Sequence, residues 1–140
     1  SQPSPKPQSI LHRLQALSPK PRILLVDDDD FNLAIFSVLL DEAKLAVDMA
    51  NNGAEAVNKV LNHDYDLILM DVQMPIMDGL TATREIRKLP QGANVPIIAI
   101  SANAYDEDKA RCFEAGMNAF LAKPILPEAF YKGVLNWLEA

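Results

Sequence analysis

The stretch DLILMDVQMPIMDG, residues 66–79, joins an apolar strand to a carboxylate and a turn. Residues 67–70 are consecutive apolar residues, so both alternating faces of the strand are apolar. Such a strand is typical of a parallel sheet that helices cover on both sides. Asp71 follows the strand directly, and Asp78-Gly79 is a turn signal before the next helical segment. The stretch therefore predicts a central strand of an α/β sheet with an acidic residue at its end.

The same alternation of short apolar runs and longer helical periods continues along the chain from Arg22 onward. Strands are predicted over residues 23–26, 45–50, 67–70, 95–100 and 119–122. Each is followed by a helix, in turn over about 30–43, 54–61, 80–89, 106–115 and from 127 onward. Five β–α pairs of this kind predict a doubly wound parallel sheet with its functional groups at the carboxyl ends of the strands.

Apolar residues at helical spacing predict which helix faces point inward. In the helix over 30–43 the expected inner stripe is Phe31, Ile35, Val38 and Leu39. In the last helix the expected inner face is Phe130, Val134, Trp137 and Leu138. Phe113 is expected in the core, and Cys112 is expected to be a small packing residue rather than a reactive thiol.

Length and charge restrict the function further. A chain of 140 residues fits a single domain. Residues 1–22 carry four basic residues and no acidic one, so residues 23–140 hold nine basic and all 19 acidic residues, a net charge of −10. An acidic body repels phosphate backbones, so we expect no direct contact with nucleic acid. The single cysteine and the short apolar runs indicate a reducing, cytoplasmic location without direct membrane contact by this domain.

The beginning of the chain has a different composition. Five of the ten prolines lie in the first 21 residues, a density that is typical of an extended linker. Apolar residues at helical spacing after Ser9 add a short helix over 9–17. We therefore divide the chain into a Pro-rich linker, residues 1–21, and a folded domain, residues 22–140.

Polar side chains follow the predicted strands where each one ends. Asp27 and Asp28 follow the first strand, Asp71 the third, Ser101 the fourth and Lys123 the fifth. In the strand order 2-1-3-4-5 the first and third strands are neighbours, so the three carboxylates would lie together. Carboxylates in contact repel one another and need a cation. Mg²⁺, a hard ion that prefers oxygen ligands, fits best, with Mn²⁺ as the alternative.

This set of side chains suits phosphoryl transfer. Asp71 is the best candidate nucleophile because it follows the most apolar strand, and carboxylates accept phosphoryl groups as acyl phosphates. Lys123 and the metal would each neutralise a phosphoryl oxygen, and the Ser101 hydroxyl would donate to a third. Asp29 and Asp30, by contrast, are expected to favour the N-terminus of the following helix.

Four motifs, in this order and near these separations, resemble the receiver domains of two-component response regulators and hybrid sensor kinases. They are ILLVDDDDFN (23–32), LILMDVQMPIMDG (67–79), IIAISANA (97–104) and AFLAKP (119–124), and the resemblance covers about residues 22–139. It implies a flavodoxin-like α/β fold of five β–α units with a five-stranded parallel sheet in the order 2-1-3-4-5. It also implies a Mg²⁺ site in which Asp28 is a direct ligand, Asp27 acts mainly through water and Gln73 offers its backbone carbonyl.

The resemblance gives roles to the other positions of the edge as well. It implies that Asp71 is the phosphoacceptor, Lys123 its phosphate partner and Ser101 the switch hydroxyl. Phe120 falls where the family places a rotating aromatic residue. Phe120 lacks the hydroxyl of a tyrosine, so an inward state held by a hydrogen bond is excluded. The resemblance further implies a cis peptide bond between Lys123 and Pro124.

These observations predict a receiver that takes a phosphoryl group from a phosphohistidine onto Asp71 and then switches conformation or passes the group to a His phosphotransfer partner. The donor would be a sensor histidine kinase or a His phosphotransfer domain, selected by exposed residues such as Phe31 and Asn32. The Pro-rich leader and a last helix that closes the chain favour the C-terminal receiver of a hybrid histidine kinase, tethered to a membrane-bound sensor. A homodimer through the helix 106–115, the strand 119–122 and the last helix is a further expectation.

Three alternatives stay open. A stand-alone single-domain response regulator is the nearest one. A phosphohydrolase that forms an aspartyl phosphate would need the pattern Asp-x-Asp-x-Thr/Val, but Phe31 stands at the last position after Asp27 and Asp29. An interaction module without phosphorylation would not need side chains that are competent for phosphoryl transfer. The five edge positions all carry such side chains, which disfavours this alternative. The receiver itself is not a classical enzyme, since it promotes only its own phosphorylation and dephosphorylation, whereas a hybrid kinase parent would be one.

Overall fold

A computed structural model describes residues 7–139 of the chain, with side chains from Ile10 onward. Helices and strands alternate along these residues. In chain order they are α1 (Pro7–Gln15), β1 (Arg22–Val26), α2 (Asp30–Glu42), β2 (Ala46–Ala50), α3 (Gly53–Asn62), β3 (Leu67–Asp71), α4 (Gly79–Arg87), β4 (Ile97–Ser101), α5 (Asp106–Ala115), β5 (Ala119–Ala122) and α6 (Pro127–Leu138). A short 3-10 helix, Pro90–Gly92, follows α4 and is not predicted by the sequence pattern.

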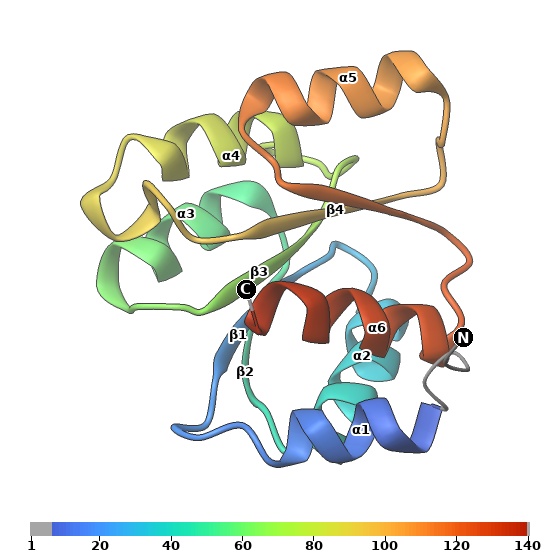
Figure 1. The fold of residues 1–140 in the computed structure, drawn as a ribbon. Helices are drawn as coiled ribbons and strands as arrows, with labels where there is room; N and C mark the ends of the chain where they lie inside the picture. The colour runs from blue at the N-terminus through green and yellow to red at the C-terminus, as the bar shows by residue number, and fades with distance from the viewer. Residues whose placement is uncertain (1–6, 140) are drawn as a thin grey trace.

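The strands form one five-stranded sheet in the order β2-β1-β3-β4-β5, and every neighbouring pair is parallel. Figure 1 shows α1, α2 and α6 on one side of this sheet and α3, α4 and α5 on the other. The predicted doubly wound α/β fold is confirmed, with β3 in the centre. Because parallel strands all end at the same edge, residues that follow different strands become neighbours there.

Alternating strand residues divide the core into two layers. Ile23 and Leu25 of β1 face the layer with α1, α2 and α6, whereas Leu24 and Val26 face the layer with α3, α4 and α5. All four side chains are fully buried, as the apolar pattern predicts. Burying a side chain of this size stabilises the fold by about 1.5–3 kcal/mol, so strands that are buried on both faces contribute much of the stability.

The inner face of α2 differs from the predicted stripe. Its buried residues are Leu33, Phe36 and Leu40. Of the predicted set, Leu39 is partly buried, and the exposed residues are Phe31, Ile35 and Val38. Both sets recur at three- and four-residue steps, so periodicity alone does not choose between them. Packing on the layer above the sheet decides the rotation of the helix: Phe36 stacks on Phe130 of α6, with ring centroids 5.0 Å apart.

Phe113 is a second correction, because it is half exposed rather than part of the core. Helix α5 turns Cys112 and Ala115 inward instead, and the prediction that Cys112 packs as a small buried residue is confirmed. In α6, Phe130 and Val134 are buried as predicted. The remaining predicted positions, Trp137 and Leu138, are only partly buried, while Tyr131 and Leu135 are buried in addition.

Helix α1 lies inside the segment that the sequence assigns to a linker. Ile10 and Leu14 are buried in the core layer of α2 and α6. The Gln15 side-chain amide donates to the Glu42 carbonyl at 2.8 Å. Helix α1 also packs along α6, and Figure 1 shows both helices on the same side of the sheet. The division between linker and domain after residue 21 stays a prediction. No helix within residues 7–139 is long and apolar enough to cross a membrane.

A polar network of Arg22, Asp48 and Tyr65 connects β2 to the start of β1. The Tyr65 hydroxyl donates to Asp48 at 2.7 Å, and Arg22 forms an ion pair with the same carboxylate at 2.9 Å. Burial acts to raise the pKa of Asp48, but the Tyr65 hydrogen bond and the Arg22 charge outweigh it and lower this pKa below its ordinary value of 3.8. Ionised Asp48 therefore stabilises the fold above about pH 4, and this contribution is lost as the pH falls through the lowered pKa.

Replacing Tyr65 with Phe is expected to lower the free energy of unfolding by about 1 kcal/mol at pH 7. At a pH below the lowered pKa of Asp48 the difference between the wild type and the variant should shrink, because protonated Asp48 no longer accepts a charge-assisted hydrogen bond. Urea titrations at the two pH values measure the difference. Tyr105→Phe, at an exposed tyrosine, is the control. An equal difference in the free energy of unfolding between wild type and variant at both pH values would contradict the role of the ionised carboxylate.

Candidate functional site

The polar residues that end the strands lie together at one edge of the sheet. Asp71 and Ser101 are the last residues of β3 and β4, and Asp27 and Lys123 directly follow β1 and β5. The parallel register pairs Asp71 with Ile100, so Ser101 stands one residue beyond it. The Lys123 N–H donates to the Ser101 carbonyl at 2.8 Å, which joins the ends of β4 and β5. The structure thus brings together the edge residues that the sequence predicts.

Three carboxylates meet at this edge. One oxygen from each of Asp27, Asp28 and Asp71 lies within 4.8 Å of the other two. Asp27 and Asp71 are buried, and Asp28 is exposed. Asp27 accepts hydrogen bonds from the Asp29 N–H at 2.9 Å and from the Asn32 side-chain amide at 3.3 Å, which fix its orientation. Asp29 is also the N-cap of α2, as the sequence predicts.

The Lys123 ammonium group lies between two of these carboxylates. Its Nζ is 3.5 Å from Asp27 Oδ2 and 3.5 Å from Asp71 Oδ1. Burial and the negative charge of Asp27 raise the pKa of Asp71 to about 7, although Lys123 acts to lower it. Three carboxylates facing one ammonium group therefore leave the cluster with an excess of negative charge.

This cluster fits a hard divalent cation. Mg²⁺ prefers carboxylate oxygens and water, and one or two carboxylates are enough to hold it. The triad Asp27, Asp28 and Asp71 offers such oxygens in the wall of a hollow of about 260 Å³, which Gln73 and Ser101 also line. A cation in this place would offset the repulsion that raises the pKa of Asp71.

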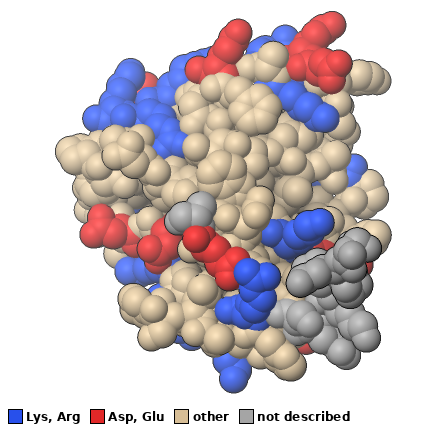
Figure 2. All heavy atoms as spheres, in the orientation of Figure 1, with Lys and Arg blue, Asp and Glu red and all other residues tan. Residues whose placement is uncertain are grey.

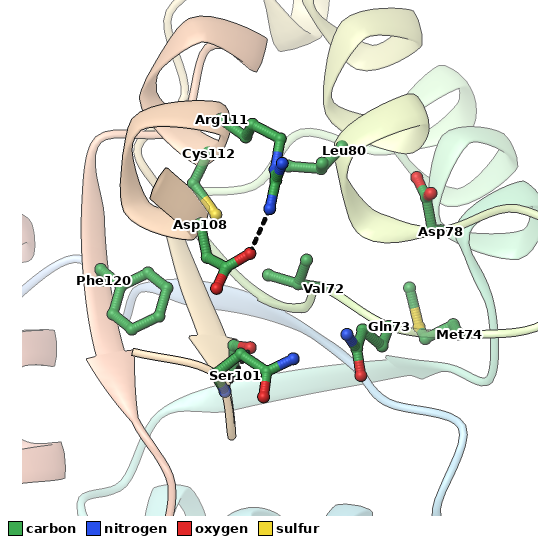
Figure 3. Close-up of a pocket in the computed structure, with 11 residues that line it drawn as sticks. Val72, Gln73, Met74, Asp78, Leu80, Ser101, Asp108, Arg111, Cys112 and Phe120 are labelled. Atoms are coloured by element: carbon green, nitrogen blue, oxygen red, sulfur yellow. Dashed lines mark hydrogen bonds and ion pairs between the residues drawn. The ribbon is translucent and has the colours of Figure 1, made fainter. Parts of the chain in front are cut away.

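A second cavity, of about 340 Å³, lies beside the acidic hollow and is lined by residues of α4 and α5. Figure 3 shows Phe120 and Ser101 in its wall, with Arg111 and Cys112 reaching it from α5. The Lys109 ammonium lies 5.6 Å from the centre of the Phe120 ring, which is a cation–π distance. Phe120 and Ser101 therefore line the same cavity, and the Lys109 ammonium lies within cation–π distance of the Phe120 ring.

Comparison with known proteins assigns the family. A family model described as the response regulator receiver domain matches residues 23–134. The chain belongs to the response regulator receiver domain family. The matched residues include every polar residue of the edge described above, from Asp27 to Lys123. The peptide bond between Lys123 and Pro124 is cis, as the resemblance in the sequence implies.

Curated relatives of this receiver domain include large histidine kinases. Hybrid signal transduction histidine kinase B of Dictyostelium discoideum is 46 % identical over 115 residues, which cover 74 % of this chain and 6 % of that protein. The histidine-protein kinase BarA of Escherichia coli K12 is 37 % identical over 115 residues, which cover 82 % of this chain and 12 % of that protein. The receiver domain thus corresponds to a small part of these relatives.

Solved structures show the same fold. The receiver domain of a sensor histidine kinase from Pseudomonas aeruginosa PAO1 is 38 % identical with a TM-score of 0.82, over 86 % of this chain and 99 % of that one. That structure has a magnesium ion coordinated in its active site cleft. The chemotaxis protein CheY4 of Vibrio cholerae is 29 % identical with a TM-score of 0.82, over 85 % of this chain and 99 % of that one. The chain is therefore a receiver domain of two-component signalling with a CheY-like fold.

Two contacts of the site are not predicted by the sequence. Asn32 is expected to face a partner, but its amide also donates to Asp27 and so belongs to the support of the acidic cluster. Its place in the first turn of α2, three residues after the N-cap Asp29, is the signal that could have indicated this contact. Lys109 and Phe120 lie on different elements, and their contact has no signature in the spacing of residues along the chain.

Proposed function

We propose that the receiver domain takes a phosphoryl group from a phosphohistidine onto Asp71. The observation that carries this proposal is the place of the Asp71 carboxylate, which is buried at the end of β3 with the Lys123 ammonium 3.5 Å away. Phosphoryl transfer needs mainly positioning and neutralisation of charge, and both are provided there. A purely structural ion pair would not place Asp27 and Asp28 beside Asp71, because their repulsion costs stability.

In the proposed step an oxygen of the Asp71 carboxylate attacks the phosphorus atom as the bond from phosphorus to the histidine nitrogen breaks. The imidazole leaves with the electron pair of the broken P–N bond, and an acyl phosphate forms on Asp71. Lys123 neutralises one phosphoryl oxygen, and the Ser101 hydroxyl donates a hydrogen bond to another. The domain gains one phosphoryl group, and no other covalent bond changes.

Mg²⁺ is the metal that we propose for this site. Asp27, Asp28 and Asp71 would hold it together with the backbone carbonyl of Gln73, with Asp28 as a direct ligand and Asp27 acting mainly through water. When bound, the ion supplies positive charge that neutralises carboxylate and phosphoryl oxygens. The cluster of oxygens within 4.8 Å supports this assignment, as does the magnesium ion in the related Pseudomonas structure. Mn²⁺ has the same ligand preference and is the alternative.

Ser101 and Phe120 are the proposed switch. Ser101 borders both the acidic hollow and the cavity beside Phe120, so a shift of its hydroxyl toward a phosphoryl group would change the space next to the ring. Such a change would bias the surface formed by α5, β5 and α6 between two states. A second copy of the chain is a proposed partner for this surface, where Phe113 is half exposed.

A hybrid histidine kinase is the parent that we propose, with a sensor kinase or a His phosphotransfer domain as phosphoryl donor or acceptor. The kinase relatives support this origin. A stand-alone response regulator is the second candidate, because the chain matches 99 % of the Vibrio chemotaxis protein. Both would act in the cytoplasm. The net charge of −6, and the interspersed acidic and basic side chains on the face in Figure 2, disfavour nucleic acid as a partner.

A mass measurement tests the proposed function. Incubation of the domain with Mg²⁺ and a small acyl phosphate is expected to add the mass of one phosphoryl group. The same incubation with a chelator should leave most of the protein unlabelled, because the carboxylates then repel the anionic donor. An unchanged mass in the presence of Mg²⁺ would overturn the proposal. Equal labelling with the chelator would overturn the role of the metal alone.

A further inference from the structure

Helix α1 packs along α6 through two apolar side chains that lie one helical turn apart. Ile10 and Leu14 are 3 % and 1 % exposed, and both belong to the core layer of α2 and α6. Residues four apart lie on the same face of a helix, so one face of α1 is buried. His12 and Arg13, between them, are exposed. The contact is therefore that of an amphipathic helix on an apolar surface, which we call the α1 site.

The polar contacts of α1 are made at the surface. Arg13 forms an ion pair with Glu139, and both side chains are more than one third exposed. The Gln15 amide donates to the Glu42 carbonyl, also at an exposed position. Exposed ion pairs and hydrogen bonds contribute little, because water competes for the same groups. The attachment of α1 therefore depends mainly on Ile10 and Leu14.

The α1 site lies at the edge of the sheet opposite to Asp71. Glu42 is the last residue of α2, and Glu139 directly follows α6. Both helices begin after the carboxyl ends of strands, so their last residues lie at the other edge. A strand of five residues, such as β1, separates the two edges by about 16 Å. The α1 site and the acidic cluster are thus separate surfaces of the domain.

Helix α1 is too short to be stable without this contact. It has nine residues, and isolated helices of this length do not persist in water. Residues 16–21, which include Pro19 and Pro21, join α1 to β1 without a helix or strand of their own. The ordered helix is therefore maintained by a few side chains, and α1 can leave its site while the sheet stays intact.

We propose that the α1 site is a helix-binding surface and that α1 is its detachable occupant. The ligand is an amphipathic helix with apolar residues at positions i and i+4, which residues 7–15 supply within the chain. In the docked state α1 holds the leader at the edge away from Asp71, so the acidic cluster stays open to its partners. This inference goes beyond the proposed function and does not depend on phosphoryl transfer.

Limited digestion with trypsin measures detachment. Trypsin cleaves after Lys and Arg but not before Pro, and Lys6 and Lys20 both precede Pro. The bond between Arg13 and Leu14 is therefore the only cleavable one before Arg22. Docked α1 protects this bond, because Leu14 is buried.

Ile10→Asn is expected to speed cleavage after Arg13 at least about tenfold, because cleavage follows the population of the open state. Cleavage after Arg22, which lies in β1, should keep the wild-type rate. Ala16→Asn, at an exposed position beside α1, is the matched control and should change neither rate. An unchanged rate after Arg13 in Ile10→Asn would overturn the role of the buried face. Equal acceleration after Arg13 and Arg22 would mean that α1 leaves only when the domain unfolds, which would overturn detachment.

A second arm tests whether the site binds a helix. The probe is a free peptide of residues 7–17, added to the full Ile10→Asn chain, whose own α1 no longer occupies the site. Trp137, the single tryptophan, packs against the core layer that contains Ile10 and Leu14, so its emission reports binding. We expect a saturable change toward the wild-type emission. The same peptide with Leu14→Asn should bind at least about tenfold more weakly. Equal binding of the two peptides, or none by either, would overturn the helix-binding role.

Labelling by a small acyl phosphate tests the separation of the two surfaces. The Ile10→Asn chain should be labelled at the wild-type rate, because the α1 site lies at the opposite edge from Asp71. Slower labelling of this variant would overturn that separation. Failure of the wild type itself to be labelled would contradict the proposed function, while the digestion and peptide experiments would still decide on the α1 site.

Discussion

Asp71→Asn is expected to abolish labelling of the receiver domain by a small acyl phosphate. The Asn amide has no anionic oxygen that can attack phosphorus, so no acyl phosphate forms on it. Asn and Asp have nearly the same shape, so the hollow beside Lys123 should keep its form. We expect incorporation below about 1 % of the wild-type level, measured by intact mass after incubation with Mg²⁺.

The fold of this variant should be at least as stable as the wild type. Burial and the charge of Asp27 raise the pKa of Asp71 to about 7, so its ionised form is disfavoured in the folded domain. At pH 8 and without metal the wild type carries this cost and the neutral amide does not, whereas below about pH 4 both side chains are neutral. Thermal unfolding at pH 8 therefore separates a loss of chemistry from a loss of fold.

Asp78→Asn is the matched control for this experiment. Asp78 is an exposed residue of the same loop and caps α4 by accepting from the Thr81 N–H at 2.8 Å. Asn is an equally good N-cap, so labelling at the wild-type level is expected. If Asp71→Asn still gained a phosphoryl group, fragment masses would place it on another residue and Asp71 would not be the acceptor.

Arg87→Ala is expected to cause a large loss of stability without touching the acidic site. The Arg87 guanidinium donates five hydrogen bonds of 2.7–3.0 Å. Its acceptors are the carbonyls of Gly92, Val95 and Gly116 and the side chain of Asn118. These bonds tie the end of α4 to the segments before β4 and β5. Burial lowers the pKa of Arg87, so carbonyl dipoles replace much of the water around its charge.

Removal of this guanidinium leaves several half-buried acceptors without a donor. We expect the free energy of unfolding to fall by about 3 kcal/mol and the midpoint of thermal unfolding to fall by about 10 °C. Arg87→Lys should recover only a small part, because one ammonium group cannot reach acceptors in several directions. Arg84→Ala, at an exposed position of the same helix, should change stability by less than about 0.5 kcal/mol. A loss of stability as small as that control's would mean that water substitutes for the guanidinium.

The strands could be predicted because both faces of each central strand are apolar, and only a sheet with helices on both sides buries both faces. The members of the candidate site followed from the same pattern. Asp27, Asp71, Ser101 and Lys123 each come where a predicted strand ends, and parallel strands end at one edge. Their distances were not predictable, because the 3.5 Å contacts of Lys123 depend on side-chain rotamers and on the exact register of neighbouring strands.

Helix α2 shows where periodicity is not enough. Almost every face of this helix carries an apolar residue, so two stripes satisfy the helical period. The wrong stripe contained Phe31 and Val38, which are 71 % and 66 % exposed. The stacking of Phe36 on Phe130 belongs to the correct stripe, and it joins residues far apart in the chain.

The sequence by itself determined the alternation of strands and helices, the parallel sheet and the identity of the polar residues at its carboxyl edge. These properties are local, because they depend on which residues are apolar and on where the chain turns. The tertiary structure alone decided the rotation of α2, the 3.5 Å contacts of Lys123 with Asp27 and Asp71, and the acceptors that surround Arg87. Each of these depends on how segments far apart in the chain are placed against one another, and the spacing of residues within one segment does not encode that placement.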